Sequence, residues 1–468
     1  MLFSSSVFLF LFLPGVLIVY YLLLRRWRQA QNIFLLLASL VFYAWGEPWF
    51  VLVMMLSIAA NYGFGLWVAR GQSAGTDTKV PVLLAAVFNL GILFVFKYLT
   101  FTLGILNRLG GALVIPGIEL PIGISFFTFQ ALSYVLDVQR GRGQAQRSPL
   151  KVGLYISFFP QLIAGPIVKY ETVADQIDHR KETWDDFAAG CTRFIVGLGK
   201  KVLLANQLAL VADRAFLLEG ADRLTTSFAW LGSLCYTLQI YYDFSGYSDM
   251  AIGLGKMFGF HFLENFNYPY ISRSVTEFWR RWHISLGSWF REYVYIPLGG
   301  NRVSRGRLCF NLMVVWGLTG LWHGASWNFL LWGLYFGVLI MAEKLWLGRL
   351  VASWPRAVQH IYTLFLVLVS WAIFALEDFG HMGQYLAAMF GFAGGGLADP
   401  AFGYYLRSYL PTLCAGILAA TPLFAGLWHK LPKKVGMVLL PLLVLAGLLV
   451  STAYLVDATY NPFLYFRF

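Results

Sequence analysis

The sequence predicts an all-α, polytopic integral membrane protein. Of its 468 residues, 59% are hydrophobic and only 12% are charged, against about 25% charged residues in an average soluble domain. Apolar runs of about 18 residues or more recur from one end of the chain to the other, and a helix needs about 20 residues to cross the hydrocarbon layer of a bilayer. These observations exclude a large soluble domain.

The predicted membrane segments follow one another along the whole chain, and several of them are short or interrupted. In order they are 7–24, 33–46, 50–68, 80–96, 120–137, 152–168, 191–211, 225–242, 308–322, 326–345, 358–376, 384–396, 410–427 and 434–455. The stretch "FFPQLIAGPIV" (158–168) is better interpreted as a half-helix or re-entrant segment, because proline and glycine interrupt it. Such backbone is tolerated at membrane depth only where protein or a water-filled cavity covers it, so these breaks usually border a site.

The excess of basic residues predicts the topology of the loops. The formal net charge is +12. In a membrane protein such an excess is first interpreted as a sign of which loops are cytoplasmic, and not as a sign of nucleic-acid binding. Basic residues follow the first predicted span at Arg25, Arg26 and Arg28, and they gather again at 140–151, with no acidic residue between 138 and 170. By the positive-inside rule these loops are cytoplasmic, which places the N-terminus on the opposite, periplasmic side.

Two neighbouring stretches carry most of the polar chemistry. "QIYYDFSGYSDMAIGLGKMFGF" (239–260) places Asp243 and Ser245 in an apolar segment, where an ionised carboxylate costs several kcal/mol unless it is paired, solvated or neutralised. The next stretch, 265–302, supplies cations at Arg273, Arg280, Arg281, Arg291 and Arg302. These arginines are explained by an interfacial amphipathic helix or by binding of an anionic donor, since arginine forks bind phosphates bidentately.

His323 lies in the apolar run "GLTGLWHGASWNFLLWGLYFG" (317–337). A histidine on an apolar helix is most often a hydrogen-bonded packing residue, but an ionisable side chain inside a span is a functional hypothesis by default. We expect Gly317, Gly320 and Gly324 to let other backbones approach, with Trp322 and Trp327 as flat walls. The imidazole suits proton transfer at neutral pH, and burial favours its neutral, basic form.

Two other kinds of site compete for these residues. A metal site would combine His283 and His323 with nearby carboxylates, but the chain lacks any local ligand spacing such as H-E-x-x-H. A Ser-His-Asp hydrolase is disfavoured because Ser245 does not lie in a G-x-S-x-G turn. We therefore predict no metal and assign His323 to acid–base chemistry.

The motifs together resemble the membrane-bound O-acyltransferase family, and within it the membrane subunits of bacterial exopolysaccharide O-acetyltransferases of the alginate and cellulose type. The stretches that carry the resemblance are "LPIGISFFTFQALSYVLDVQRG" (120–141), "FFPQLIAGPIVKY" (158–170), "YYDFSGYSDMAIGLG" (241–255), "NFNYPYISRSVTEFWRRWHISLGSWFREYVYIPLGGNR" (265–302) and "GLWHGASWNFLLWG" (320–333). The resemblance implies one domain over 1–468, with a catalytic middle at about 120–335. It also implies roughly 11 or more membrane helices, with re-entrant or half-helices, around a central tunnel.

The resemblance also implies the roles of particular residues. The family's catalytic histidine corresponds to His323, and its second polar position corresponds to His283. The remaining candidates for lining the tunnel or binding the donor are Asp243, Ser245, Arg280, Arg281, Arg291, Trp322 and Asn328. No bound cofactor is expected, and acetyl-CoA is the expected donor substrate.

The same resemblance implies location and partners: a bacterial inner membrane, membrane lipids, periplasmic polysaccharide-acetylation proteins and the exopolysaccharide synthesis and export machinery. Three alternatives stay open. The first is a D-alanyl transferase for teichoic acid, and the second is a lipid acyltransferase. The third, from a different class, is a proton-coupled transporter or flippase whose histidines relay protons.

Overall fold

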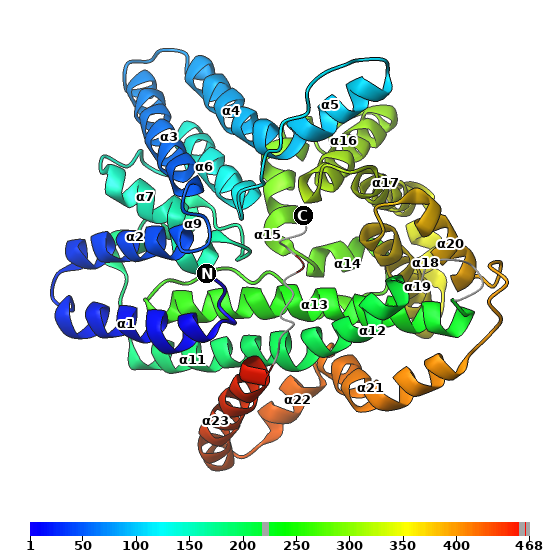
Figure 1. Cartoon of the computed structure of the whole chain (residues 1–468). Coiled ribbons are helices and arrows are strands. Elements are labelled where there is room, and N and C mark those ends of the chain that lie inside the picture. Colours follow the sequence, from blue (N-terminus) through cyan, green and yellow to red (C-terminus); the bar gives the residue numbers. More distant parts are fainter. Residues whose placement is uncertain (218–223, 458–463, 465–468) are drawn as a thin grey trace. The chain divides into compact units, whose positions relative to one another are not determined.

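The computed structural model describes residues 1–217, 224–457 and Leu464, and every regular element in these ranges is a helix (Figure 1). This confirms the all-α prediction. The chain forms two compact units, which are described separately. Unit 1 comprises residues 1–197 and 247–263, and unit 2 comprises 198–246 and the chain from 264 onward. The helices α11 (Trp184–Gly199) and α13 (Thr226–Met257) each run from one unit into the other.

The other elements of unit 1 are η1 (Phe8–Phe12), α1 (Leu13–Ile18), η2 (Val19–Leu23), α2 (Arg28–Ala44), α3 (Phe50–Ser73), α4 (Lys79–Leu93), η3 (Phe94–Tyr98), α5 (Leu99–Arg108), α6 (Ile124–Gln139), α7 (Pro149–Ser157), α8 (Phe159–Leu162), α9 (Tyr170–Val173) and α10 (Gln176–His179). Here η1, η2 and η3 are single wider turns of π-helix.

The other elements of unit 2 are η4 (Lys200–Ala205), α12 (Asn206–Phe216), η5 (Pro269–Ile271), α14 (Val275–Arg281), α15 (Ile284–Phe290), η6 (Arg291–Tyr295), α16 (Arg305–His323), α17 (Trp327–Ala342), η7 (Glu343–Leu347), α18 (Gly348–Ser353), α19 (Arg356–Ala375), α20 (Phe379–Met389), α21 (Pro400–Ala419), α22 (Leu423–Lys430) and α23 (Lys433–Asp457).

Six helical stretches in the described ranges are long and apolar enough to cross a membrane, or seven if α21 and α22, which meet at a 70° bend, form one broken span. The six are Phe50–Ser73, Lys79–Arg108, Trp184–Phe216, Trp327–Ser353, Arg356–Ala375 and Lys433–Asp457. These helices confirm a membrane protein, while the count of roughly 11 stays a prediction. The expected break is present, because α7 ends at Ser157 and only the four-residue α8 follows.

In unit 1, polar side chains within the apolar helices bind one another. The amides of Asn61 on α3 and Asn89 on α4 exchange two hydrogen bonds, of 3.0 and 2.8 Å. On α11, Arg193 donates two hydrogen bonds to Asp249, of 3.0 and 2.8 Å. The asparagine pair is fully buried and the ion pair is partly buried. In both, the new hydrogen bonds offset the cost of removing polar groups from water.

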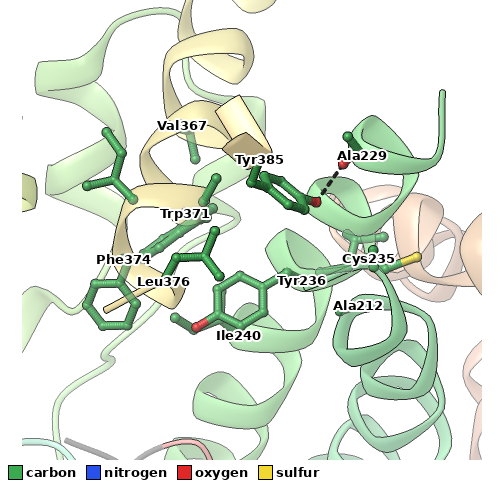
Figure 2. Packing of buried hydrophobic residues seen from close by; sticks show 14 of the residues in the cluster. Ala212, Ala229, Cys235, Tyr236, Ile240, Val367, Trp371, Phe374, Leu376 and Tyr385 are labelled. Carbon is green, nitrogen blue, oxygen red and sulfur yellow. Dashed lines mark hydrogen bonds between the residues drawn. The ribbon is translucent and has the colours of Figure 1, made fainter. Parts of the chain in front are cut away.

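The core of unit 2 is an aromatic and aliphatic cluster that joins α13 to α19 and α20 (Figure 2). No proline interrupts residues 226–257, so α13 runs as one long helix. The Tyr385 hydroxyl of α20 donates to the carbonyl of Ala229 at 2.7 Å, as the dashed line in Figure 2 marks. Trp371 and Phe374 of α19 belong to the same cluster, and both are at most 2% exposed. The cluster therefore holds the end of α19 next to the candidate site.

The helices α16 and α17 form a close hairpin through two glycines. A Cβ on Gly320 would lie 2.3 Å from the carbonyl oxygen of Phe329, and one on Gly333 would lie 2.4 Å from that of Trp316. The predicted close approach at Gly320 is therefore confirmed. The prediction for Gly317 is wrong, because the nearest atom to its Cβ would be a leucine methyl group at 4.0 Å. The prediction for Gly324 is also wrong, because a phenylalanine ring and not a backbone approaches it.

Candidate active site

The candidate site lies in unit 2, at the end of α16. His323 is the last residue of this helix, because Gly324 is extended (φ −170°, ψ 158°) and the chain turns into α17 after three residues. The imidazole is 5% exposed. The close packing at Gly320, three residues earlier, fixes the position of His323 relative to α17.

Aromatic rings from three helices surround the His323 ring. Its centroid lies 5.1 Å from Trp322, 5.0 Å from Trp332 on α17 and 5.4 Å from Phe374 on α19. All three rings stand nearly perpendicular to the imidazole, at 83°, 89° and 81°. Such edge-to-face contacts are directional, so the surrounding rings favour one orientation of the buried imidazole.

His283 lies between α14 and α15 in a backbone conformation that few residues adopt. Its φ is 44° and its ψ is 53°, which is left-handed. For a residue with a Cβ this conformation costs about 1 to 2 kcal/mol. Strained residues of this kind cluster at active sites, where the surrounding structure holds them in place. The ring of His283 is 1% exposed.

The two predicted histidines meet at Trp322. The centroid of its indole lies 5.7 Å from that of His283 and 5.1 Å from that of His323. His283 also packs against Phe244 of α13, with 4.6 Å between the ring centroids. The structure therefore brings His283, predicted from the 265–302 stretch, together with Trp322 and His323, which were predicted from the 320–333 stretch.

Asn328 supports this group from α17. Its side-chain nitrogen donates to the carbonyl of Phe374 at 2.9 Å, and Phe374 is one of the rings against His323. The carbonyl oxygen of the Asn328 side chain is buried without a hydrogen-bond partner in the part of the chain that the structure describes. Asn328 thus fixes the end of α19 and leaves an acceptor inside the unit.

Asp243 forms a buried ion pair. Its carboxylate lies 2.6 Å from Lys201 Nζ, with both side chains at most 4% exposed, and it also accepts the backbone N–H of Leu464 at 2.9 Å. Lys201 was not singled out from the sequence. The only sequence signal was the need of an intramembrane carboxylate for a cation.

Ser245, another candidate for lining the tunnel, is as buried as Asp243, and its hydroxyl has no hydrogen-bond partner among the described residues.

The arginines of the 265–302 stretch divide into different roles. Arg281 Nε donates to Glu277, one turn earlier on α14, at 3.0 Å. Burial alone would raise the pKa of Glu277, but the N–H of Arg273 and the guanidinium of Arg281 outweigh it and lower that pKa. Arg280 lines an open cavity of about 600 Å³, together with Arg273 and Lys344. Arg291 is exposed at the start of η6.

Glu343 ties the end of α17 to the start of α14. Its carboxylate accepts the backbone N–H groups of Val275 and Thr276, both at 2.8 Å. These are two of the amides that a helix leaves without internal partners at its first turn. Because α14 leads directly into the His283 loop, Glu343 contributes to placing that loop, a role that the sequence did not reveal.

Comparison with known proteins identifies the family of the chain. The sequence profile of the membrane-bound O-acyltransferase family matches residues 146–379. A probable alginate O-acetylase of Azotobacter vinelandii is 45% identical over 85% of this chain and 80% of its own length. The chain belongs to the membrane-bound O-acyltransferase family. This confirms the resemblance drawn from the motifs and makes the protein a membrane-bound acyltransferase.

Other relatives of this O-acyltransferase act on different polymers. A peptidoglycan O-acetyltransferase of Helicobacter pylori is 33% identical over 84% of the chain and 80% of its own length. A teichoic acid D-alanyltransferase of Bacillus subtilis is 27% identical over 56% of the chain and 70% of its own length. The profile match spans His283 and His323, so both lie in the part of the chain that is characteristic of the family.

In the described ranges, no group of three or more His, Cys, Asp or Glu side chains could hold a metal ion. In this O-acyltransferase the partners of His283 are Asn265 and Ser285, at 3.2 and 3.5 Å from Nδ1. Neither residue received a role from the sequence. Asn265 is 18 residues from His283 along the chain, so their contact depends on how the chain folds back, while Ser285 lies next to His283 but has no distinctive sequence signal.

Proposed function

We propose that this enzyme takes an acetyl group from a cytoplasmic thioester donor, acetyl-CoA, and passes it across the membrane for O-acetylation of an exopolysaccharide such as alginate or cellulose. The observation that carries the proposal is the pair of buried histidines that share Trp322, in a chain 45% identical to a probable alginate O-acetylase. The bacterial inner membrane is the matching location, with the N-terminus in the periplasm.

His323 acts as the general base. Its neutral form, favoured by burial, removes the proton from the acceptor hydroxyl as the oxygen attacks the thioester carbonyl carbon. The new C–O bond forms, the C–S bond breaks, and the leaving thiolate takes up the proton from the imidazolium. General-base catalysis contributes about 10²- to 10⁴-fold to the rate, and the perpendicular rings around His323 support the fixed orientation that proton transfer requires.

The donor is anionic, and the cavity beside α14 suits its phosphates. Three cationic side chains line that cavity, Arg280, Arg273 and Lys344, and they outnumber its two carboxylates, Glu277 and Glu343. Guanidinium groups bind phosphates bidentately. Arg281 is already bound to Glu277, so its part is to hold α14 rather than to bind the donor. The acetylated product leaves toward periplasmic polysaccharide-acetylation proteins and the exopolysaccharide export machinery.

A D-alanyl transferase is the second candidate, since a teichoic acid D-alanyltransferase is 27% identical over 56% of the chain. The higher identity and coverage of the alginate O-acetylase favour acetyl transfer. A lipid acyltransferase has no comparable support, and membership of an acyltransferase family disfavours the transporter or flippase.

The test is transfer of label from acetyl-labelled coenzyme A into an alkali-labile ester, in inside-out vesicles from cells that co-express the neighbouring genes. We compare wild type with His323→Ala at equal membrane levels, and His429→Ala, an exposed histidine on α22, is the matched control. Labelling should need His323 and not His429. Full labelling by His323→Ala would overturn the assignment of the base, and labelling only from a D-alanyl-loaded carrier protein would favour the second candidate.

A further inference from the structure

Asn265 binds the backbone of the two residues that follow His283, through both its main chain and its side chain. Its carbonyl oxygen accepts the N–H of Ile284 at 3.0 Å. Its side-chain Oδ1 accepts the N–H of Ser285 at 3.2 Å and the Ser285 hydroxyl at 2.9 Å. Asn265 is 1% exposed. These bonds clamp the two residues that follow the left-handed His283.

The same bonds determine which way the Asn265 amide faces. A backbone N–H can only donate, so the side-chain atom that meets the N–H of Ser285 is the oxygen and not the nitrogen. This oxygen carries no proton. The Nδ1 atom of His283 lies 3.2 Å from it. Two lone pairs at that distance would repel each other, so Nδ1 of His283 carries the proton and donates.

A neutral imidazole has one N–H, and its other nitrogen is an acceptor. With the proton on Nδ1, the lone pair of His283 is on Nε2. Within the described residues, Nε2 has no hydrogen-bond partner. Phe244 from α13 and Trp322 from α16 pack against the ring of His283. His323 is the titratable side chain whose charge would interact with that of His283.

We propose that Asn265 is a positioning residue that holds His283 in its Nδ1-protonated tautomer, which makes Nε2 a hydrogen-bond acceptor toward the substrates. Neutral His283 therefore binds an N–H or O–H group and does not donate to the thioester carbonyl. This inference rests on the proposed function for its catalytic meaning, whereas the tautomer itself follows from the hydrogen bonds alone.

Activity measurements test the positioning role. In the vesicle assay, Asn265→Ala should lower kcat by about 10- to 100-fold, the range seen when the partner that orients a metal-bound histidine is lost, with little change in KM. Asn265→Asp keeps the acceptor oxygen and should restore most of kcat. Its carboxylate also favours the imidazolium, so the acidic limb of the pH profile should move upward by about one unit or more. Asn267→Ala, an exposed position in the same loop, is the matched control and should behave as wild type.

The inference is overturned if Asn265→Ala has wild-type kcat, or if Asn265→Asp is as inactive as Asn265→Ala. A direct measurement does not depend on activity. In protein labelled with ¹⁵N-histidine, the His283 signals, assigned by their loss in His283→Ala, should show a protonated Nδ1 and an unprotonated Nε2. The opposite tautomer would refute the inference even if His323→Ala is inactive. Conversely, an active His323→Ala would refute the proposed function and leave the tautomer result standing.

Discussion

The glycine contact between α16 and α17 predicts a large catalytic effect from one added methyl group. In Gly320→Ala, the new Cβ would lie 2.3 Å from the carbonyl oxygen of Phe329, and ordinary contact begins at 3.4 Å. Moving this pair from 2.3 to 3.4 Å requires the helices to separate by about 1.1 Å. The clashing atom belongs to the backbone of α17, so a side-chain rotation cannot relieve it.

That separation moves His323 relative to Trp332, since the two rings lie on the two helices that separate. A misplacement of about 1 Å in an active site can cost about 100-fold in rate, and we expect a loss of that order in kcat. Overpacking should also lower stability by about 1 to 3 kcal/mol, which leaves the protein inserted in the membrane. The assay is label transfer in vesicles at equal protein levels, with thermal unfolding of the detergent-solubilised protein alongside.

Gly317→Ala is the matched control, on the same helix and one turn earlier. Its Cβ would meet nothing closer than a Leu334 methyl group at 4.0 Å. Alanine also favours a helix over glycine by about 1 kcal/mol, so this variant should be fully active and at least as stable as wild type. Wild-type kcat in Gly320→Ala, or equal damage in both variants, would refute the argument that close backbone approach positions His323.

Two further predictions concern charged side chains of unit 2. Lys201→Met leaves Asp243 buried without its cation, which should destabilise the protein by about 3 to 5 kcal/mol, measured as thermal unfolding. The double variant with Asp243→Leu should regain most of that loss, and no recovery would contradict the pairing. Arg280→Ala should raise KM for acetyl-CoA and leave kcat within a factor of about three, because a surface charge that binds a phosphate acts on binding rather than on chemistry. An unchanged KM would exclude Arg280 from donor binding.

The sequence was most informative where a residue type is rare in membrane helices. An imidazole in an apolar run marks His323, and a proline and glycine in the 158–168 segment mark the break after α7. Both signals are local, because burial of a polar group or loss of a backbone N–H carries a cost wherever the chain folds.

Contacts between residues that are not neighbours in the sequence were not predictable. The hydrogen bonds from Ser285 to Asn265 and the pairing of Lys201 with Asp243 join residues that are 20 and 42 positions apart, with no local pattern that links them. The left-handed backbone of His283 also has no signal of its own in the sequence, since most histidines adopt negative φ. Glycine positions were predicted only in part, because a glycine has the same local signal whether another backbone or empty space faces it, as Gly320 and Gly317 demonstrate.

Two contacts of α17 have a mechanical consequence. Near its middle, Gly333 packs against α16, which carries His323, and after its end Glu343 holds the first amides of α14, which leads to His283. Because α17 contacts both segments that carry the histidines, it sets the distance between the two imidazoles. A tilt of α17 would therefore move both rings together and preserve the distance between them.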